Sequence, residues 1–376
     1  MTDQQWQWVA SDEALRVAID EASREPAVAV DTEFRRRDTF FPQVALVQIA
    51  TPSTCWLIDP LTINDTSPLK QLLANPDIVK VLHSASEDLE IFEYWLGVLP
   101  QPLFDTQKAA GLLSLGFGLS YRALVEQLLD LVLDKEETQS DWLARPLTPS
   151  QQAYAAQDVI YLIKLYALLS DSAQSQGRVD WILEEGRFAE TGGRGPLAKF
   201  KSAWKLGAKQ QWALAALVAW REEQARTRDK PRSWILNDKV ISEMARRMPS
   251  NSYELGGVEG LPKGLIRRAG DELVNLINNA PESAQAAAET SFLKPPSSRL
   301  RRIAKSLGEV AEGLAAQLNV NVEMTVPNRE LELIAREASG ETIQRPRAWS
   351  GWRATAIVEP LLEQARLAIE DDDETC

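Results

Sequence analysis

Two acidic residues at a spacing of two form the first pattern in this sequence that could do chemistry. Asp31 and Glu33 follow the apolar run 27–30, which predicts a buried strand. Side chains two residues apart in a strand point to the same face, so the two carboxylates should lie together. Close carboxylates repel each other unless a cation lies between them, and oxygen ligands favour Mg²⁺ or Mn²⁺. The pair therefore predicts a divalent metal site, although a strand that ends in solvated acids is an equally good interpretation of this motif alone.

Two further patterns could complete such a site. Asp88 follows a predicted strand in the first turn of a predicted helix, at a sheet edge where α/β proteins bind ligands. A helix-dipole partner is the alternative role for this acid. Tyr154 and Asp158 are four residues apart in a predicted helix and therefore share one face. A tyrosine packed in the core beside a solvated aspartate is the alternative there.

Composition excludes several other kinds of site. The chain has one histidine, His83, so it cannot form a multi-histidine zinc site. Its two cysteines, Cys55 and Cys376, are too few for a disulfide framework or a cysteine-rich metal site. No apolar run approaches the length of a membrane span, and the first residues are neither basic nor apolar. We therefore expect a soluble, cytoplasmic protein.

The elements that must position these side chains alternate between strands and helices. Apolar runs predict strands at 27–30, 44–49, 54–59 and 79–82. Helical patterns follow at 86–96 and 120–128. Short connections join the first three strands, which favours mixed strand directions. The first part of the chain is thus predicted to be an α/β domain with a mixed sheet and flanking helices.

Charge and chain breaks divide the 376 residues into three predicted domains. The net charge is −13, which by itself argues against binding of nucleic acid. The charge is uneven, however, with −14 over 1–195, +6 over 196–280 and −5 over 281–376. Glycine and proline at 191–196 and in 281–298 predict linkers. We therefore expect an α/β domain at 1–190 and all-helical domains at 200–280 and 298–370.

The acidic residues and the tyrosine, in their order along the chain, resemble the motifs of a known enzyme superfamily. Asp31 with Glu33, then Asp88, then Tyr154 with Asp158 resemble the three motifs of the DEDD 3′→5′ exonucleases, in their tyrosine branch. Within that superfamily the chain is similar to the ribonuclease D family, on the stretches 31–34, 41–43, 83–89 and 140–147. The segment 205–280 resembles the helical domain shared by RecQ-type helicases and ribonuclease D (HRDC), and 298–370 resembles a diverged second copy.

This resemblance implies a fold and a mechanism. The implied fold is a ribonuclease H-like mixed sheet followed by two helical-bundle domains. The implied mechanism is hydrolysis with two divalent ions, Mg²⁺ or Mn²⁺, bound by the four carboxylates. Asp31 would bridge both ions, Glu33 and Asp158 would complete the site of the ion that activates water, and Asp88 would serve the second ion. Tyr154 would orient the water.

The resemblance also implies the substrate and the state of the protein. The substrates would be tRNA precursors and other small structured RNAs, trimmed from the 3′ end with release of 5′-mononucleotides by a monomer. A DNA exonuclease of the same superfamily and a non-catalytic nucleic-acid-binding protein are the alternatives.

Five residues that follow Glu33 are candidates for binding RNA. Arginines suit phosphate contact and aromatic rings suit stacking on bases, which makes candidates of Arg35, Arg36, Arg37, Phe40 and Phe41. A solvated basic loop with two core phenylalanines is the alternative. We interpret His83, Asp105 and Asp141 as structural.

Overall fold

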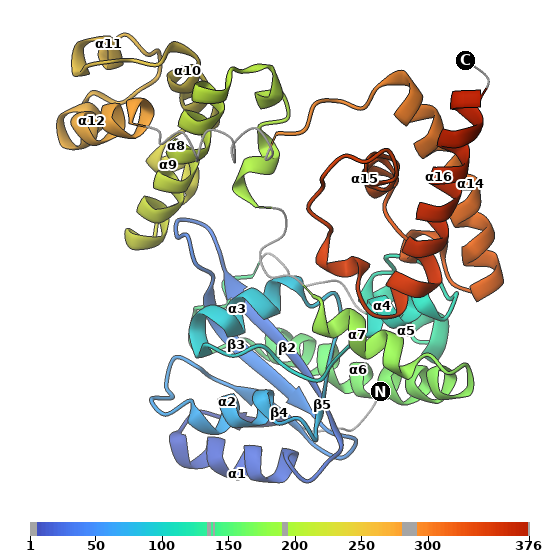
Figure 1. Cartoon of the computed structure of the whole chain (residues 1–376). Coiled ribbons are helices and arrows are strands. Elements are labelled where there is room, and N and C mark those ends of the chain that lie inside the picture. Colours follow the sequence, from blue (N-terminus) through green and yellow to red (C-terminus); the bar gives the residue numbers. More distant parts are fainter. Residues whose placement is uncertain (1–5, 134–136, 138–139, 190–194, 280–291, 375–376) are drawn as a thin grey trace. The chain divides into compact units, whose positions relative to one another are not determined.

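The computed structural model describes residues 6–133, 137, 140–189, 195–279 and 292–374. It forms two compact units (Figure 1): unit 1 comprises residues 1–35, 44–191 and 296–376, and unit 2 comprises residues 36–43 and 192–295. Most of the two predicted linkers, 191–196 and 281–298, lies outside the described residues. The structure differs from the three-domain division, because the segment predicted as a third domain shares unit 1 with the first.

A six-stranded mixed sheet lies at the centre of unit 1, and it confirms the predicted fold class. The strands lie in the order β1-β4-β3-β2-β5-β6. Their bounds are Trp6–Val9 (β1), Ala27–Arg35 (β2), Gln43–Ala50 (β3), Cys55–Ile58 (β4), Val79–Leu82 (β5) and Leu103–Asp105 (β6). β3 and β4 are antiparallel, whereas β2, β5 and β6 are parallel neighbours. The end of β2 and the loop after β5 therefore lie at the same edge of the sheet.

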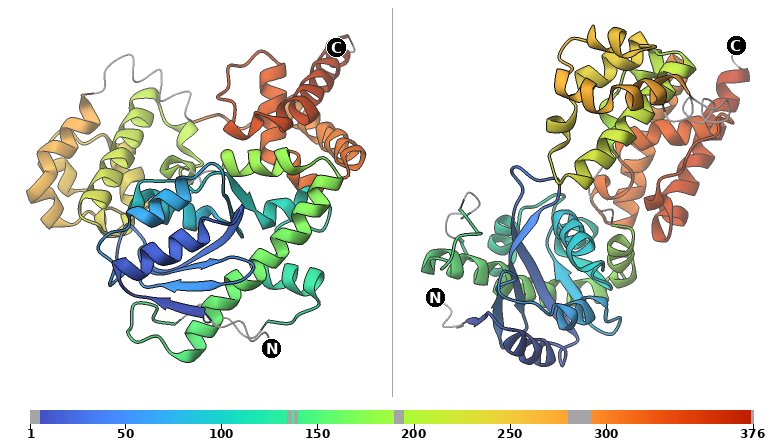
Figure 2. Two further views of the ribbon diagram at one scale, coloured as in Figure 1. Left: turned by 90° about the horizontal axis from the view of Figure 1, so that it is seen from below. Right: turned by 90° about the vertical axis from the view of Figure 1, so that its left-hand side faces the viewer.

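Helices cover both faces of this sheet (Figure 2). One face packs against α1 (Asp12–Ala22), α2 (Ser67–Ala74) and α3 (Ser86–Leu96). The other packs against α4 (Thr106–Leu112), α5 (Tyr121–Leu129), α6 (Pro149–Ser175) and α7 (Val179–Arg187). Along β2, Val28 and Val30 belong to the core with α3, whereas Ala27 and Ala29 belong to the core with α6. Because successive side chains of a strand point to opposite faces of the sheet, this pattern predicts which helix each later residue of β2 faces.

Local sequence explains where α6 begins. The Thr148 side chain accepts a hydrogen bond from the Gln151 backbone N–H, and the Gln151 side chain accepts one from the Thr148 backbone N–H. This reciprocal cap, followed by Pro149 at the first helical position, is a strong helix start. Although α6 has 27 residues, neither it nor any other described helix is long and apolar enough to cross a membrane.

The C-terminal part of unit 1 contacts α7 through residues that precede its last helix. Its helices are α14 (Ser298–Leu318), α15 (Asn328–Ala338) and α16 (Glu359–Glu374). The ring of Trp352, just before α16, stacks on Trp181 of α7 with centroids 4.4 Å apart and planes at 9°. Beside this stack, the buried guanidinium of Arg353 pairs with Glu185 at 2.8 Å. These aromatic and ionic contacts explain why the segment belongs to unit 1.

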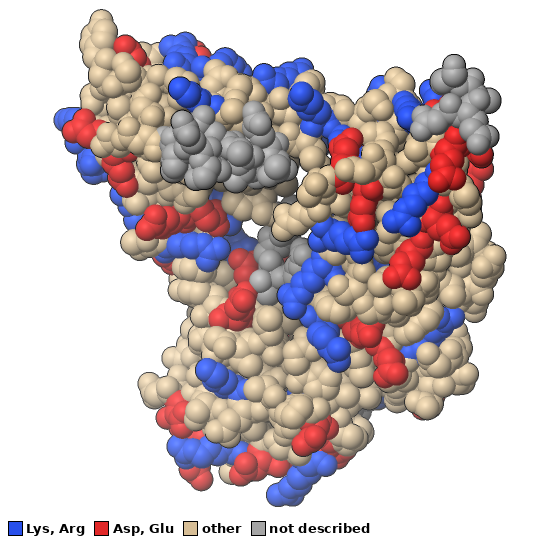
Figure 3. Space-filling view, viewed as in Figure 1, with Lys and Arg blue, Asp and Glu red and all other residues tan. Residues whose placement is uncertain are grey.

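Unit 2 is helical, as the sequence predicts. Its helices are α8 (Ala208–Thr227), α9 (Arg232–Ile235), α10 (Asp238–Arg247), α11 (Ser252–Gly256) and α12 (Lys263–Asn278). Their apolar faces form one core, which includes Leu214, Leu217 and Ile241. Figure 3 shows basic side chains interspersed with acidic ones on the surface over these helices.

Candidate active site

Three carboxylates come together between the sheet and α6. Asp31 and Glu33 continue the alternation of Ala27 and Ala29 and therefore face α6, which carries Asp158. One carboxylate oxygen from each of Asp31, Glu33 and Asp158 lies within 4.8 Å of the others. The strand continues to Arg35, so the two acids lie inside β2 rather than beyond its end. Strand and helix periodicity thus bring three of the four predicted ligands into one cluster.

Asp88, the fourth predicted ligand, lies outside this cluster. It is buried in the first turn of α3, and its carboxylate accepts a hydrogen bond from the hydroxyl of Thr32. Thr32 lies between the two acids in sequence but follows Val28 and Val30, so it faces α3. Asp88 nevertheless interacts with the cluster, since its negative charge raises the pKa of both Asp31 and Glu33. Sequence reasoning missed Thr32. Its position between the two acids, on the opposite face of the strand, could have indicated a polar contact with the helix on that face.

Asp105 fixes the start of α3 and so positions Asp88. Its carboxylate accepts hydrogen bonds from the backbone N–H groups of Ser84 and Ala85, each at 3.1 Å. It also accepts from the Gln107 backbone N–H at 2.8 Å and thereby caps α4. Ser84 has a φ of 57°, a left-handed conformation that costs energy outside glycine and needs such support. The predicted structural role of Asp105 is confirmed.

A cavity of about 180 Å³ opens beside the cluster. Its polar lining comprises Asp31, Glu33, His83, Ser120, Tyr121, Arg122, Tyr154, Gln157 and Asp158. Tyr154 thus lines the same cavity as Asp158. Sequence reasoning missed Tyr121 and Arg122, because no motif in this chain singles out the start of α5.

Two ring side chains of the cavity are held by hydrogen bonds. The Tyr121 hydroxyl donates to the backbone carbonyl of Gln157 at 2.8 Å, next to Asp158. His83 contacts the Thr106 hydroxyl through Nδ1 at 2.9 Å and the Leu119 carbonyl through Nε2 at 3.1 Å. Both ring nitrogens of His83 are therefore engaged with the protein, as its predicted structural role requires.

Burial and mutual repulsion raise the pKa values of these acids. Burial, followed by the charges of Asp88, Asp158 and Glu33, raises the pKa of Asp31 well above its usual range. The pKa of Glu33 rises to about 9, mainly through burial, and burial raises that of Asp88 to about 7. Among the described residues, no lysine or arginine forms an ion pair with Asp31 or Glu33. A half-buried cluster of carboxylate oxygens fits a hard divalent ion.

The metal-free protein is expected to lose stability as the pH rises from about 5 to about 9. Glu33 has an ordinary pKa of 4.5 when unfolded and about 9 when folded, so the folded state binds the extra proton between these values. Ionisation therefore destabilises the folded state progressively over this range. Thermal unfolding in a chelator at several pH values measures the loss, and Glu33→Gln should flatten the profile. A profile for this variant as steep as for the wild type would contradict the assignment.

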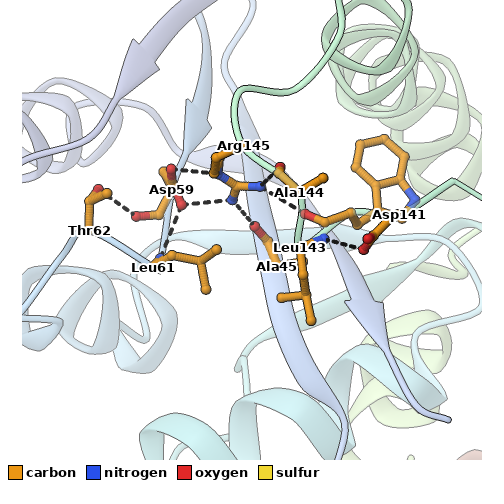
Figure 4. Close-up of polar contacts among 9 residues, drawn as sticks. Ala45, Asp59, Leu61, Thr62, Asp141, Leu143, Ala144 and Arg145 are labelled. Atoms are coloured by element: carbon orange, nitrogen blue, oxygen red, sulfur yellow. Dashed lines mark hydrogen bonds and ion pairs between the residues drawn. The ribbon is translucent and has the colours of Figure 1, made fainter.

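An arginine and a buried aspartate hold the segment 140–147 on the sheet (Figure 4). Arg145 donates to both carboxylate oxygens of Asp59, each at 2.7 Å, and to the Ala45 carbonyl at 2.6 Å. In the same segment, the Asp141 carboxylate accepts from the Leu143 backbone N–H at 3.2 Å, which confirms its structural role.

This segment also reaches the site. The ring of Trp142 lies against the ring of Tyr154, with centroids 6.1 Å apart. Arg145, which donates to the Trp142 carbonyl at 2.8 Å, thus helps to position the tyrosine that lines the cavity.

The predicted RNA-binding residues Arg36, Arg37, Phe40 and Phe41 belong to unit 2, whereas Arg35 ends β2 in unit 1. The side chain of Phe40 is 6% exposed and joins the core of unit 2. The guanidinium carbons of Arg226 and Arg232 lie 5.0 and 4.6 Å from its ring centroid. The ring is therefore not available to stack on a base, which corrects our hypothesis for Phe40 in favour of core packing. Phe41 is half-buried against the same core.

Comparisons with known proteins agree with this geometry. A family model described as 3′-5′ exonuclease matches residues 6–174, and the HRDC domain model matches residues 210–277. Ribonuclease D of Pseudomonas paraeruginosa is 37% identical over 363 residues, covering 95% of this chain and 96% of the relative. Ribonuclease D of Escherichia coli is 33% identical, covering 95% and 97%. The crystal structure of Escherichia coli RNase D, described as an exoribonuclease involved in structured RNA processing, is similar with a TM-score of 0.82 at 32% identity, covering 96% of this chain and 99% of that one.

Proposed function

This chain belongs to the ribonuclease D family and is a 3′→5′ exoribonuclease, and from that premise we propose that it trims the 3′ ends of tRNA precursors and other small structured RNAs. The products would be 5′-mononucleotides. The observation that carries the proposal is the cluster of Asp31, Glu33 and Asp158 in a cavity that Tyr154 also lines. We further propose that the enzyme acts as a monomer in the cytoplasm, where such RNA precursors are processed.

The acidic cluster, and the match of this chain to the 3′-5′ exonuclease family, support the use of divalent metal. We propose two ions, Mg²⁺ or Mn²⁺, with Asp31 shared between them. Glu33 and Asp158 would complete one site, and Asp88, held by Thr32, would serve the other. When bound, such ions lower the pKa of water and stabilise the charge of the attacking and leaving oxygens. The protein contributes four carboxylates whose repulsion is relieved on binding, so metal affinity should increase with pH.

Tyr154 is proposed to orient the attacking water. A phenol hydroxyl can both donate and accept a hydrogen bond, and Tyr154 lines the cavity beside the acids, so it is suited to positioning the water. The ring of Tyr154 packs against the ring of Trp142. Phenylalanine would keep this packing and lack only the hydroxyl group.

Tyr154→Phe is expected to lower kcat by about 10²-fold, a typical effect of misplacing a reacting group by about 1 Å, with little change in KM. Steady-state kinetics on a 3′-extended RNA measure both constants. Tyr166→Phe is the matched control, because Tyr166 lies on the same helix but packs against Phe104 and does not line the cavity. Equal kcat values for the two variants would contradict the role of Tyr154.

The substrate proposal is tested by digesting a 3′-extended tRNA and a single-stranded DNA side by side. We expect faster trimming of the RNA, with the reaction dependent on added Mg²⁺ or Mn²⁺. Preferential digestion of the DNA would favour a DNA exonuclease of the same superfamily. Binding of the RNA without any cleavage, in either metal, would favour a non-catalytic binding protein.

A further inference from the structure

We propose that unit 2 carries a binding site for single-stranded RNA, formed by a basic pocket and the exposed ring of Trp234. The inference rests on the proposed function for the identity of the polymer. It assigns Arg36 and Arg37, which follow the catalytic strand in sequence, to a phosphate site in unit 2.

The loop that carries these arginines is anchored in unit 2 at several points. The Asp229 carboxylate accepts hydrogen bonds from the backbone N–H groups of Phe40 and Phe41, at 2.9 and 3.0 Å. The guanidinium groups of Arg226 and Arg232, in the same unit, both approach the buried ring of Phe40. The amine of Lys230 approaches the Asp38 carbonyl at 3.5 Å. The backbone of the loop is therefore anchored in unit 2, and Arg36 and Arg37 precede these anchor points in sequence.

These arginines line a pocket of about 370 Å³ in which cations outnumber acids. Its charged lining comprises Arg36, Arg37, Lys199, Arg221, Arg232 and Asp238.

Two of the cations already have acidic partners. Arg221 pairs with Asp238, and Arg232 pairs with Glu222 through two hydrogen bonds at 2.6 and 2.7 Å. Arg37 and Lys199 are exposed and have no acidic partner in the part of the chain that the structure describes. The pocket therefore keeps a surplus of positive charge, and a phosphate group would match it.

An exposed aromatic ring beside the pocket indicates which phosphate compound binds. Trp234 is 64% exposed and directly follows the lining residues Arg232 and Ser233. The amine of Lys230 lies 5.7 Å from its ring centroid and so connects the ring with the loop at Asp38. An exposed aromatic ring next to a cationic pocket is the combination that binds an unstacked base and its backbone phosphate. Free inorganic phosphate would use the pocket alone, and a duplex would offer no unstacked base to the ring.

The test measures binding of labelled RNA in a chelator, which prevents digestion. The probes are a single-stranded RNA of about ten nucleotides, within the usual footprint of such sites, and a duplex of the same sequence. The variants are Arg37→Ala with Lys199→Ala, and Trp234→Ala. Arg267→Ala with Arg268→Ala is the matched control, because it removes the same charge from exposed positions of unit 2 outside the pocket. All these side chains are exposed, so the fold should be kept.

We expect the Arg37 and Lys199 variant to bind the single strand about tenfold more weakly than the control variant. For this variant, the slope of the logarithm of the binding constant against the logarithm of the salt concentration should become shallower by about 1.4. Two phosphate contacts are lost, and each contributes about 0.7 on a single strand. Trp234→Ala should weaken binding of the single strand and leave the duplex unaffected. The proposal would be overturned if the pocket variant and the control variant bound the single strand equally well. It would also be overturned if inorganic phosphate displaced the RNA and Trp234→Ala had no effect on RNA binding. Equal losses of affinity for duplex and single strand in Trp234→Ala would overturn it as well. Metal-dependent digestion of a dinucleotide by the wild type is a separate measurement, and it reports on the proposed function rather than on this site.

Discussion

Asp31→Asn is expected to lower kcat for 3′-end digestion by roughly 10³-fold or more, at least the effect of removing one preorganised electrostatic contact. Asp31 lies within 4.8 Å of both Glu33 and Asp158, and it is the residue proposed to be shared by the ions. Asparagine has almost the same shape but supplies no negative charge for a divalent ion. The rate of mononucleotide release with Mg²⁺ in excess measures the effect.

The fold of this variant should remain intact. Burial and three neighbouring acids already raise the pKa of Asp31, so a neutral side chain removes repulsion in the metal-free protein. We therefore expect Asp31→Asn to unfold at an equal or higher temperature than the wild type in a chelator. Asp20→Asn, at an exposed position of α1, is the control for loss of one acidic charge. An active Asp31→Asn enzyme, or an inactive one that is also unfolded, would contradict this explanation.

Arg145→Ala is expected to destabilise the protein by about 3–5 kcal/mol, the usual cost of breaking a buried ion pair from one side. The Asp59 side chain is 3% exposed, and Arg145 donates to both of its carboxylate oxygens. Without the guanidinium, the buried carboxylate loses two of its hydrogen-bond donors and its ion-pair partner, and the Ala45 carbonyl loses the donor that Arg145 supplies. The midpoint of urea unfolding measures the loss.

Two comparisons make this second prediction specific. Arg16→Ala removes an exposed pair with Glu13, whose side chains are 49% and 81% exposed, and should change stability by less than about 1 kcal/mol. Asp59→Asn combined with Arg145→Ala should cost less than the sum of the two single changes, because no buried charge is then left without a partner. Additive losses, or an Arg145→Ala effect as small as that of Arg16→Ala, would show that the buried pair does not hold the segment 140–147.

The sequence predicted that Asp31, Glu33 and Asp158 come together, because local periodicity determines most of this cluster. A spacing of two in a strand puts Asp31 and Glu33 on one face, and a spacing of four in a helix does the same for Tyr154 and Asp158. The short strands β1 and β6 escaped prediction, since runs of four and three residues carry little periodic signal. The mixed sheet and the helical unit 2 nevertheless follow from pattern and chain breaks.

The residues that sequence reasoning missed depend on contacts between distant positions. Thr32 reaches Asp88 across 56 positions, and Arg145 reaches Asp59 across 86. No spacing rule connects such pairs before the sheet and its helices are assembled. Phe40 is the opposite case, because a loop phenylalanine suits either a base or a core, and only packing against unit 2 decides between them.

Net charge was the least informative property of the sequence. The total of −13 argues against nucleic acid, yet it includes half-buried acids that suit metal binding and a segment, 196–280, with a charge of +6. The location of each charge, rather than the sum, indicates the partner.

The most direct test is to follow the first product released from a structured RNA labelled at its 3′-terminal nucleotide. The account predicts that the label leaves as a 5′-mononucleotide, only with added Mg²⁺ or Mn²⁺, and that the remaining RNA shortens from its 3′ end. Release of a labelled oligonucleotide, release of a nucleotide with a 3′-phosphate, or the same release in a chelator would contradict it.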